Sequence, residues 1–217
     1  MADAPRFSRP SPRRLLTAFG VVVLVAITAV LFDSPVTSLT PQWKCSLIDN
    51  LVAVLNPIGS GLTLLIFCVL LGATCRALPL SPLGTASWLG ALAFTCAGLV
   101  EFAVKHIVSR PRPATALQSL TVLGPSVVPE IDSFPSGHAT SVFAVATVFA
   151  AFYPRLRWPL YAVAAAVAVG RVYLDRHYLS DILAGAAIGI AIALSLLHYH
   201  QTLWSRTVVE APADLRS

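Results

Sequence analysis

Residues 132–153 read DSFPSGHATSVFAVATVFAAFY, a polar turn that opens directly onto a long apolar run. Pro135 and Gly137 flank Ser136, and His138 follows just before the apolar residues begin. An apolar run of about 20 residues is long enough to cross the hydrocarbon of a membrane, where the backbone must satisfy its own hydrogen bonds in a helix. The stretch therefore predicts a membrane helix that carries a glycine-opened, histidine-bearing turn at its mouth.

The rest of the chain follows the same apolar pattern. Of its 217 residues, 56% are hydrophobic and 12% are charged, whereas a soluble domain has about 25% charged residues. Six apolar runs predict membrane spans, at Leu15–Phe32, Ile58–Cys75, Leu83–Val104, Gly137–Tyr153, Trp158–Val172 and Leu179–Tyr199. We therefore expect an all-α polytopic membrane protein, a bundle of six transmembrane helices over residues 15–200, between a basic N-terminal segment (1–14) and a tail (201–217).

The basic residues predict how the chain is oriented in the membrane. Four arginines precede the first span, at Arg6, Arg9, Arg13 and Arg14, and such residues favour the cytoplasmic side. Both termini are then cytoplasmic, and the chain is expected in the inner membrane of a bacterium. A signal peptide is the alternative interpretation of the first span. A second, weaker signal at Trp43–Leu55 indicates an interfacial helix in the first outer loop.

Charge and cysteine usage exclude two other classes. The net charge is +5, but the basic residues are dispersed between apolar spans. This dispersal favours membrane topology and a local anion site over a nucleic-acid partner. The four cysteines show neither metal-ligand spacing nor a disulfide framework.

Three polar segments fall on one side of the membrane when the six spans alternate. They read KHIVSRPRP at 105–113, PSGH at 135–138 and GRVYLDRHYLSD at 170–181, and all three are expected at the outer face. Ionisable residues at the ends of spans are costly and are often functional. Lys105, Arg112 and Arg171 together favour an anion with several oxygens, which phosphate fits best.

The same segments supply groups for phosphate chemistry. Ser136 and Gly137 at a helix start offer a hydroxyl and backbone N–H groups for an anion. His177 and Asp181 are four residues apart, so we expect them to share a helix face and form a hydrogen bond. The acid would fix the imidazole tautomer and leave the other nitrogen as a nucleophile, while His138 would serve as general acid and then base.

Simpler interpretations exist for several of these residues. Arg171 with Asp175 is compatible with an ordinary ion pair at four-residue spacing. Arg110 and Arg176 are compatible with solvated groups or lipid-headgroup contacts, and His198 and His200 with interfacial positions on the inner side. Glu101, inside the third span, receives no role from the sequence.

The ordered motifs resemble the signature of the type 2 phosphatidic acid phosphatase family. The pattern K-x6-R-P corresponds to Lys105, Arg112 and Pro113, the P-S-G-H pattern to residues 135–138, and R-x5-H-x3-D to Arg171, His177 and Asp181. The resemblance implies that the three cations, Ser136 and Gly137 bind the phosphoryl oxygens. It also implies that His177 forms a phosphohistidine, that Asp181 orients it, that His138 is the acid and base, and that neither metal nor cofactor takes part. Many members have Ser where this chain has Gly170, which removes one potential hydroxyl contact.

The expected function is hydrolysis of a lipid phosphate or diphosphate at the outer face, with membrane lipids as the other partners. Candidate substrates are a polyprenyl diphosphate such as undecaprenyl diphosphate, phosphatidic acid, phosphatidylglycerol phosphate and the lipid A phosphates. Two alternatives use the same residues differently. One is an enzyme resembling the vanadium-dependent haloperoxidases, and the other is a binder or transporter of lipid phosphates without turnover.

Overall fold

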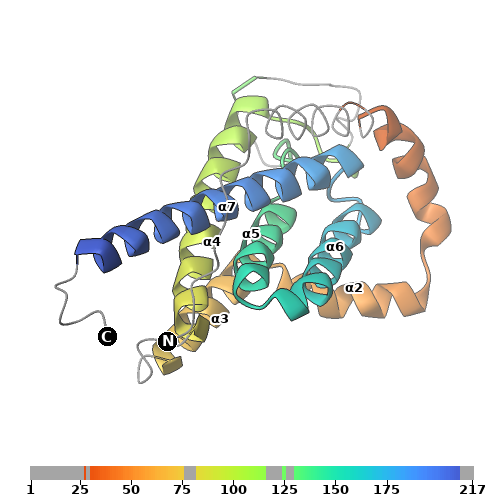
Figure 1. The fold of residues 1–217 in the computed structure, drawn as a ribbon. Helices are drawn as coiled ribbons and strands as arrows, with labels where there is room; N and C mark the ends of the chain where they lie inside the picture. Colours follow the sequence, from red (N-terminus) through yellow and green to blue (C-terminus); the bar gives the residue numbers. More distant parts are fainter. Residues whose placement is uncertain (1–26, 28–29, 76–81, 116–123, 126–129, 211–217) are drawn as a thin grey trace.

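The computed structural model describes residues 27, 30–75, 82–115, 124–125 and 130–210, and every regular element within these ranges is helical. Residues 30–39 form a helix that continues into the short 3-10 turn η1 (Thr40–Trp43). The remaining elements are α2 (Ser46–Ile58), α3 (Gly61–Thr74), α4 (Pro82–Val108), α5 (Gly137–Phe152), η3 (Pro154–Leu156), α6 (Arg157–Tyr173) and α7 (Leu179–Glu210) (Figure 1). The described part of the chain is therefore all-α, as the sequence predicts.

Five of the six predicted spans coincide with helices α3 to α7. By length and composition, α4 and the first 25 residues of α7 are able to cross a membrane. Helices α2 and α3 meet the same test only as a pair, bent by 54°. Helices α5 and α6 have 16 and 17 residues, and at about 1.5 Å per residue each is shorter than a hydrocarbon core of about 30 Å. The first predicted span lies mostly outside the described residues.

The bend between α2 and α3 has a local cause in the sequence. Pro57 lies in the last turn of α2, where its ring removes a backbone donor, and Gly59 caps the helix. The hydroxyl of Ser60 then accepts the backbone N–H of Thr63 and caps the start of α3. Helix α2 occupies most of the segment in which the sequence predicts an interfacial helix. Leu47, Leu51 and Val54 on its outer face remain exposed.

The core lies where α4, α5 and α7 pack together through small side chains. Ala93 and Ala97 of α4 meet Ala144 and Val148 of α5 and Ala193 of α7 in one fully buried cluster. Gly185 and Gly189 of α7 bring that helix against the backbone of α5. A Cβ atom at Gly189 would lie 2.2 Å from the carbonyl oxygen of Thr140. The glycines therefore set how closely the two helices approach.

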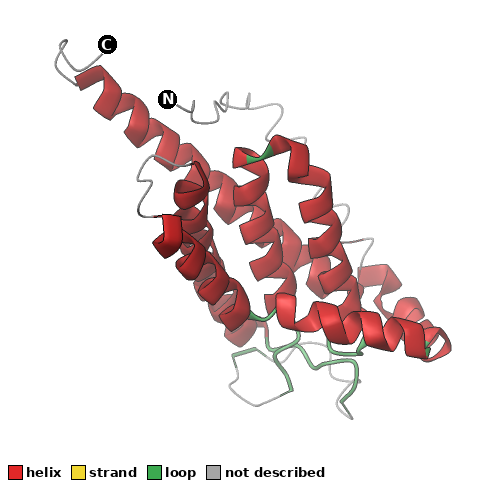
Figure 2. Cartoon of the chain, turned by 90° about the horizontal axis from the view of Figure 1, so that it is seen from below, coloured by secondary structure: helices red, strands yellow, loops and turns green. Residues whose placement is uncertain are grey.

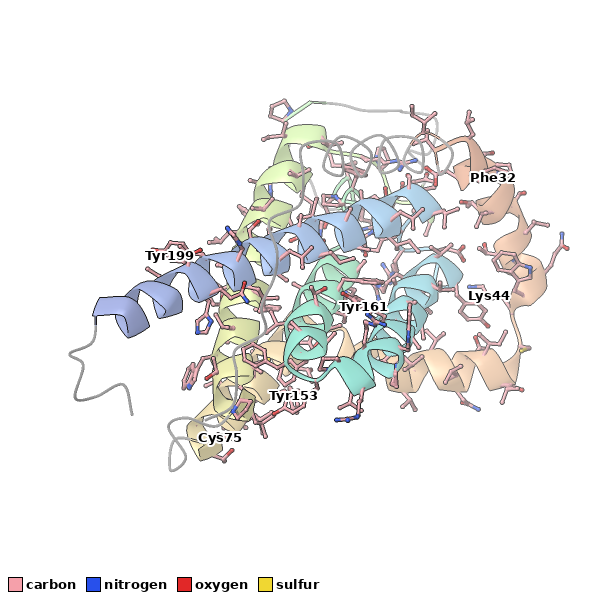
Figure 3. The ribbon with its side chains drawn as sticks, viewed as in Figure 1. Phe32, Lys44, Cys75, Tyr153, Tyr161 and Tyr199 are labelled. Carbon is pink, nitrogen blue, oxygen red and sulfur yellow. The ribbon has the colours of Figure 1, made fainter. Side chains whose placement is uncertain are left out.

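This close packing brings distant segments of the chain to one end of the bundle. Figure 1 shows α7 crossing α4 and α5, and Figure 2 shows most of the described loop segments together at one end of the helices. These loops follow α4, precede α5 and join α6 to α7. Farther along the helices, Tyr161 of α6 faces α5 and its hydroxyl bonds Thr147 at 3.0 Å (Figure 3). The loop end therefore carries the three segments that the sequence groups together.

Candidate active site

His177 lies in the short connection between α6 and α7 and is only 2% exposed. Its Nδ1–H donates to the backbone carbonyl of Ser133 at 2.8 Å. Because a carbonyl can only accept, this hydrogen bond keeps the proton on Nδ1 and leaves the lone pair on Nε2. Burial lowers the pKa of His177 below its ordinary value of 6.5. The ring is thus held neutral, with Nε2 available as a nucleophile.

Asp181 does not make the hydrogen bond to His177 that its spacing predicts. The distance from Asp181 Oδ2 to His177 Nδ1 is 3.8 Å, which is too long for a hydrogen bond. Helix α7 begins only at Leu179, so His177 precedes the helix and does not share its register. Asp181 acts on the ring through its charge, and the carbonyl of Ser133 fixes the tautomer.

The fully buried carboxylate of Asp181 is held by other groups instead. Oδ2 accepts the hydroxyl of Ser133 at 2.5 Å and the backbone N–H of Tyr178 at 2.8 Å. Oδ1 accepts the guanidinium of Arg110 at 2.7 Å. In addition, the backbone N–H of Ser136 donates to the carbonyl of Asp181 at 3.0 Å. The start of α7 is thereby joined to the turn that opens α5.

His138 lies in the first turn of α5, at the start of the same helix. Electrostatic interactions connect its ring with Arg171, His177, Lys105 and Arg112. Its side chain also packs against Gly59 at the α2–α3 bend, where an added Cβ atom would lie 2.9 Å from the ring. The structure thus brings His177 and the three predicted phosphate-binding cations close enough to His138 to interact with it electrostatically.

Each of the three cations is partnered by a neutral or acidic group. Lys105, in the last turn of α4, forms an ion pair with Glu101 at 2.5 Å. Arg112 makes two hydrogen bonds to the carboxylate of Asp132, at 2.8 and 2.9 Å. Arg171 donates to the side-chain oxygen of Asn56 at 2.5 Å. Glu101, for which the sequence offers no role, is therefore the partner of a predicted phosphate ligand.

Two buried donors at this site have no hydrogen-bond partner within the described residues. They are the Oγ atom of Ser136 and the Nε atom of Arg171. Ser136 also precedes α5 without capping it through its side chain. Gly137 begins the helix beside Glu101, and a Cβ atom there would lie 2.9 Å from Glu101 Oε1. The serine hydroxyl and the arginine Nε thus offer buried donors suited to phosphate oxygens, beside the start of a helix.

Two of the simpler interpretations from the sequence are wrong. Asp175 forms its ion pair with Lys44 at 3.1 Å and accepts the hydroxyl of Thr40, so it does not pair with Arg171. Arg110 is not a solvated group, because its largely buried guanidinium bridges Asp181 and Asp33 at 2.7 and 2.8 Å. Arg176, in contrast, is exposed.

Among the site partners that the sequence does not indicate are Ser133 and Asp33. Ser133 contributes a carbonyl to His177 and a hydroxyl to Asp181, and both of its roles depend on the fold. Asp33 is an acid at the end of an apolar run, a position at which ionisable residues are often functional. In the described ranges, no group of three or more His, Cys, Asp or Glu side chains is arranged to hold a metal ion.

Comparison with known proteins gives the family. The sequence model of the PAP2 superfamily matches residues 86–205. The chain is also 31% identical over 187 residues to the lipid A 1-phosphatase of Rhizobium etli, an alignment that covers 79% of this chain and 78% of that protein. The chain belongs to the PAP2 superfamily. As a PAP2 protein it is a membrane phosphatase by family, which confirms the resemblance drawn from the three motifs.

Solved structures of PAP2 proteins share this fold. The transmembrane phosphatidylglycerolphosphate phosphatase of Bacillus subtilis superposes with a TM-score of 0.67 at 20% identity, over 86% of this chain and 96% of that one. Aquifex aeolicus LpxE gives 0.62 at 22% identity, over 77% and 96% of the two chains. The expected membrane-embedded helical bundle is therefore confirmed as a PAP2 fold.

Proposed function

We propose that this protein hydrolyses the phosphate ester of a membrane lipid, with His177 as the nucleophile. The observation that carries the proposal is the hydrogen bond from His177 Nδ1–H to the carbonyl of Ser133. It leaves Nε2 unprotonated at the end of the bundle where the three cations gather. A neutral, oriented imidazole beside a cationic cradle is suited to in-line attack on phosphorus.

In the first step, the Nε2 lone pair of His177 forms a bond to phosphorus, and the bond from phosphorus to the lipid oxygen breaks. Protonated His138 gives its proton to that oxygen, so the lipid leaves as an alcohol. The imidazole, still protonated at Nδ1, becomes a positively charged phosphohistidine. Lys105, Arg112, Arg171 and the start of α5 balance the charge of the phosphoryl oxygens, a role that other enzymes give to metal ions.

In the second step, His138 accepts a proton from a water molecule as the water oxygen attacks phosphorus. The P–N bond breaks, its electron pair returns to Nε2, and inorganic phosphate is released. His177 is again neutral, and His138 is again protonated for the next cycle. The scheme requires no cofactor, because its proton transfers and charge balance come from side chains of this chain.

For the substrate, we propose a phosphate ester of the lipid A type. The similarity to a lipid A 1-phosphatase extends over 79% of the chain, well beyond the three motifs. The site lies at the ends of apolar helices, where a lipid can keep its chains in hydrocarbon while its phosphate enters the cradle. From the basic N-terminal segment, we place this end at the outer face of the bacterial inner membrane.

The test is phosphate release from purified protein in detergent, with lipid A, phosphatidylglycerol phosphate, phosphatidic acid and undecaprenyl diphosphate as a panel. We expect lipid A to give the largest kcat/KM, excess chelator to leave the rate unchanged, and vanadate to inhibit. If the protein releases phosphate from another lipid of the panel and not from lipid A, the proposed substrate is wrong. Dependence on a divalent metal would refute the cationic scheme.

A second experiment tests the nucleophile. His177→Ala should release no phosphate. When a reaction with radiolabelled substrate is quenched, this variant should also give no acid-labile phosphoprotein. His106→Ala is the matched control, because the His106 ring bonds the carbonyl of Phe102 within its own helix α4, at 2.7 Å. If His177→Ala retains a tenth of wild-type turnover, His177 is not the nucleophile.

A further inference from the structure

A buried carboxylate outside the three motifs is joined to the site. Asp33, in the helix over residues 30–39, is 4% exposed. Its Oδ1 accepts the backbone N–H of Ser180 at 2.8 Å, and its Oδ2 accepts the hydroxyl of Ser180 at 2.5 Å. Oδ2 also accepts Arg110 at 2.8 Å. Asp33 therefore joins the first described helix to the start of α7 and to Arg110 through three hydrogen bonds.

Arg110 continues the connection toward the nucleophile. Its guanidinium stacks on the ring of Tyr178, at 3.9 Å from the ring centroid, and reaches Asp33 and Asp181 with separate nitrogens. The three side chains Asp33, Arg110 and Asp181 form one buried chain of alternating charge. Two carboxylates and one guanidinium leave it with a net charge of −1.

That net charge depends on Asp33. Without it, Arg110 would neutralise Asp181, and the neighbouring imidazole of His177 would face a neutral pair. Arg112 and Arg171, which are both cations, also act on His177, and His138 of α5 interacts with it electrostatically. A positive charge that forms on His177 among these groups needs a compensating negative charge.

We propose that Asp33 is a positioning residue for the phosphohistidine step, because it holds Arg110 and keeps the Asp33–Arg110–Asp181 chain negative toward His177. This inference rests on the proposed function. Asp33 touches neither substrate nor the reacting atoms, and it acts by preserving the charge of Asp181. When Nε2 bonds to phosphorus, the ring becomes positive, and the residual negative charge of the chain stabilises that state.

Substitutions that change the net charge in opposite directions separate this electrostatic role from simple anchoring. Asp33→Asn preserves the shape of the side chain and makes the Asp33–Arg110–Asp181 group neutral. Arg110→Gln instead gives this group a net charge of −2. Combining the two substitutions restores −1 through Asp181 alone. Protonation of Nε2 on His177 prevents its attack on phosphorus, so kcat/KM falls at low pH. The position of this fall, the acid limb of the pH profile, reports the charge near the ring. Comparison between variants on one substrate cancels the titration of the substrate itself.

We expect Asp33→Asn to lower kcat about tenfold with KM changed less than threefold, and to move the acid limb to lower pH by about one unit. Arg110→Gln should move the limb to higher pH, and the double variant should return it to the wild-type position. Asp49→Asn is the control, because Asp49 accepts the hydroxyl of Tyr173 at 2.7 Å outside this chain of charges. It should leave the limb in place.

Limbs that coincide in wild type, Asp33→Asn and Arg110→Gln would show that Asp33 only anchors the helix. If Asp33→Asn fails to fold, as judged by thermal melting in detergent, the upward shift in Arg110→Gln decides, and its absence contradicts the proposal. A wild-type protein that releases no phosphate from any lipid refutes the proposed function first. An active wild type with unmoved limbs refutes only the role of Asp33.

Discussion

The middle of the α4–α5–α7 bundle and its loop end are built on opposite principles. In the middle, alanines and glycines pack together with few polar atoms, and the helices approach closely because these side chains are small or absent. At the loop end, Ser133, Asp181 and Arg110 meet through directed hydrogen bonds. Substitutions in the middle should therefore change stability, whereas those at the loop end should change turnover.

The largest effect is expected from a methyl group in the middle. Gly189→Ala places Cβ 2.2 Å from the carbonyl oxygen of Thr140 and 3.0 Å from the backbone nitrogen of Ala144. Backbone cannot give way as a side chain can, so we expect a loss of about 3 kcal/mol of folding free energy. Thermal melting in detergent measures it. Gly98→Ala is the matched control in α4, because a Cβ there meets nothing within 4 Å. Equal melting of the two variants would contradict the close-packing argument.

The same methyl group at the loop end should affect turnover instead. Gly137→Ala directs Cβ at Glu101, a side chain that can move but that holds Lys105. We expect nearly unchanged melting and a fall of about a hundredfold in kcat/KM, since a displaced charge misaligns the phosphate. Adding Glu101→Asp shortens the acid and should recover part of the activity. No recovery in the double variant would mean that the methyl group acts directly on the substrate.

Removal of one hydroxyl from each region sharpens the contrast. Ser133→Ala keeps the carbonyl that orients His177 but deprives Asp181 of one of its donors. We expect kcat to fall about tenfold, equivalent to about 1.4 kcal/mol. Thr147→Ala removes a hydroxyl between α5 and α6. It should lower the melting temperature slightly without changing kcat. A larger kcat loss in Thr147→Ala than in Ser133→Ala would reverse the comparison.

The smallest effect concerns pH. Because burial lowers the pKa of His177 below 6.5, the ring stays neutral as the pH falls through 6.5. The His177-dependent loss of kcat/KM should therefore begin below that value. An unfolded chain would already bind a proton there, so folding stability should decrease as the pH falls from 6.5 toward the folded-state pKa. Rate profiles, corrected for substrate titration by phosphorus NMR, measure the limb, and a midpoint at or above 6.5 contradicts it.

Much of this arrangement could be predicted from the sequence, for reasons that are local. Apolar runs locate α3 to α7. The turn at Pro135–His138 predicts where α5 begins, and the helix does begin there, at Gly137. The grouping of three motifs at one end follows from alternating spans. These inferences need only helix periodicity, turn chemistry and the length of a membrane crossing.

The partners of individual site residues could not be predicted in this way. His177 bonds a backbone carbonyl, and every residue has one, so no residue type marks that acceptor. The expected hydrogen bond from His177 to Asp181 requires a helix that begins two residues before α7 does. Asp33 and Arg110 are 77 positions apart, and only the tertiary packing shows that they meet.

The pairing of Arg112 with Asp132 and of Lys105 with Glu101 has a consequence for the protein at rest. A cluster of bare cations would repel itself and resist folding at the edge of a membrane. Here two of the three carry their own counter-ions within the chain, so the cradle can assemble before any phosphate arrives. An incoming phosphate must compete with these carboxylates, and the same carboxylates can help to expel the product. The protein thus exchanges some affinity for the ability to fold empty and to turn over.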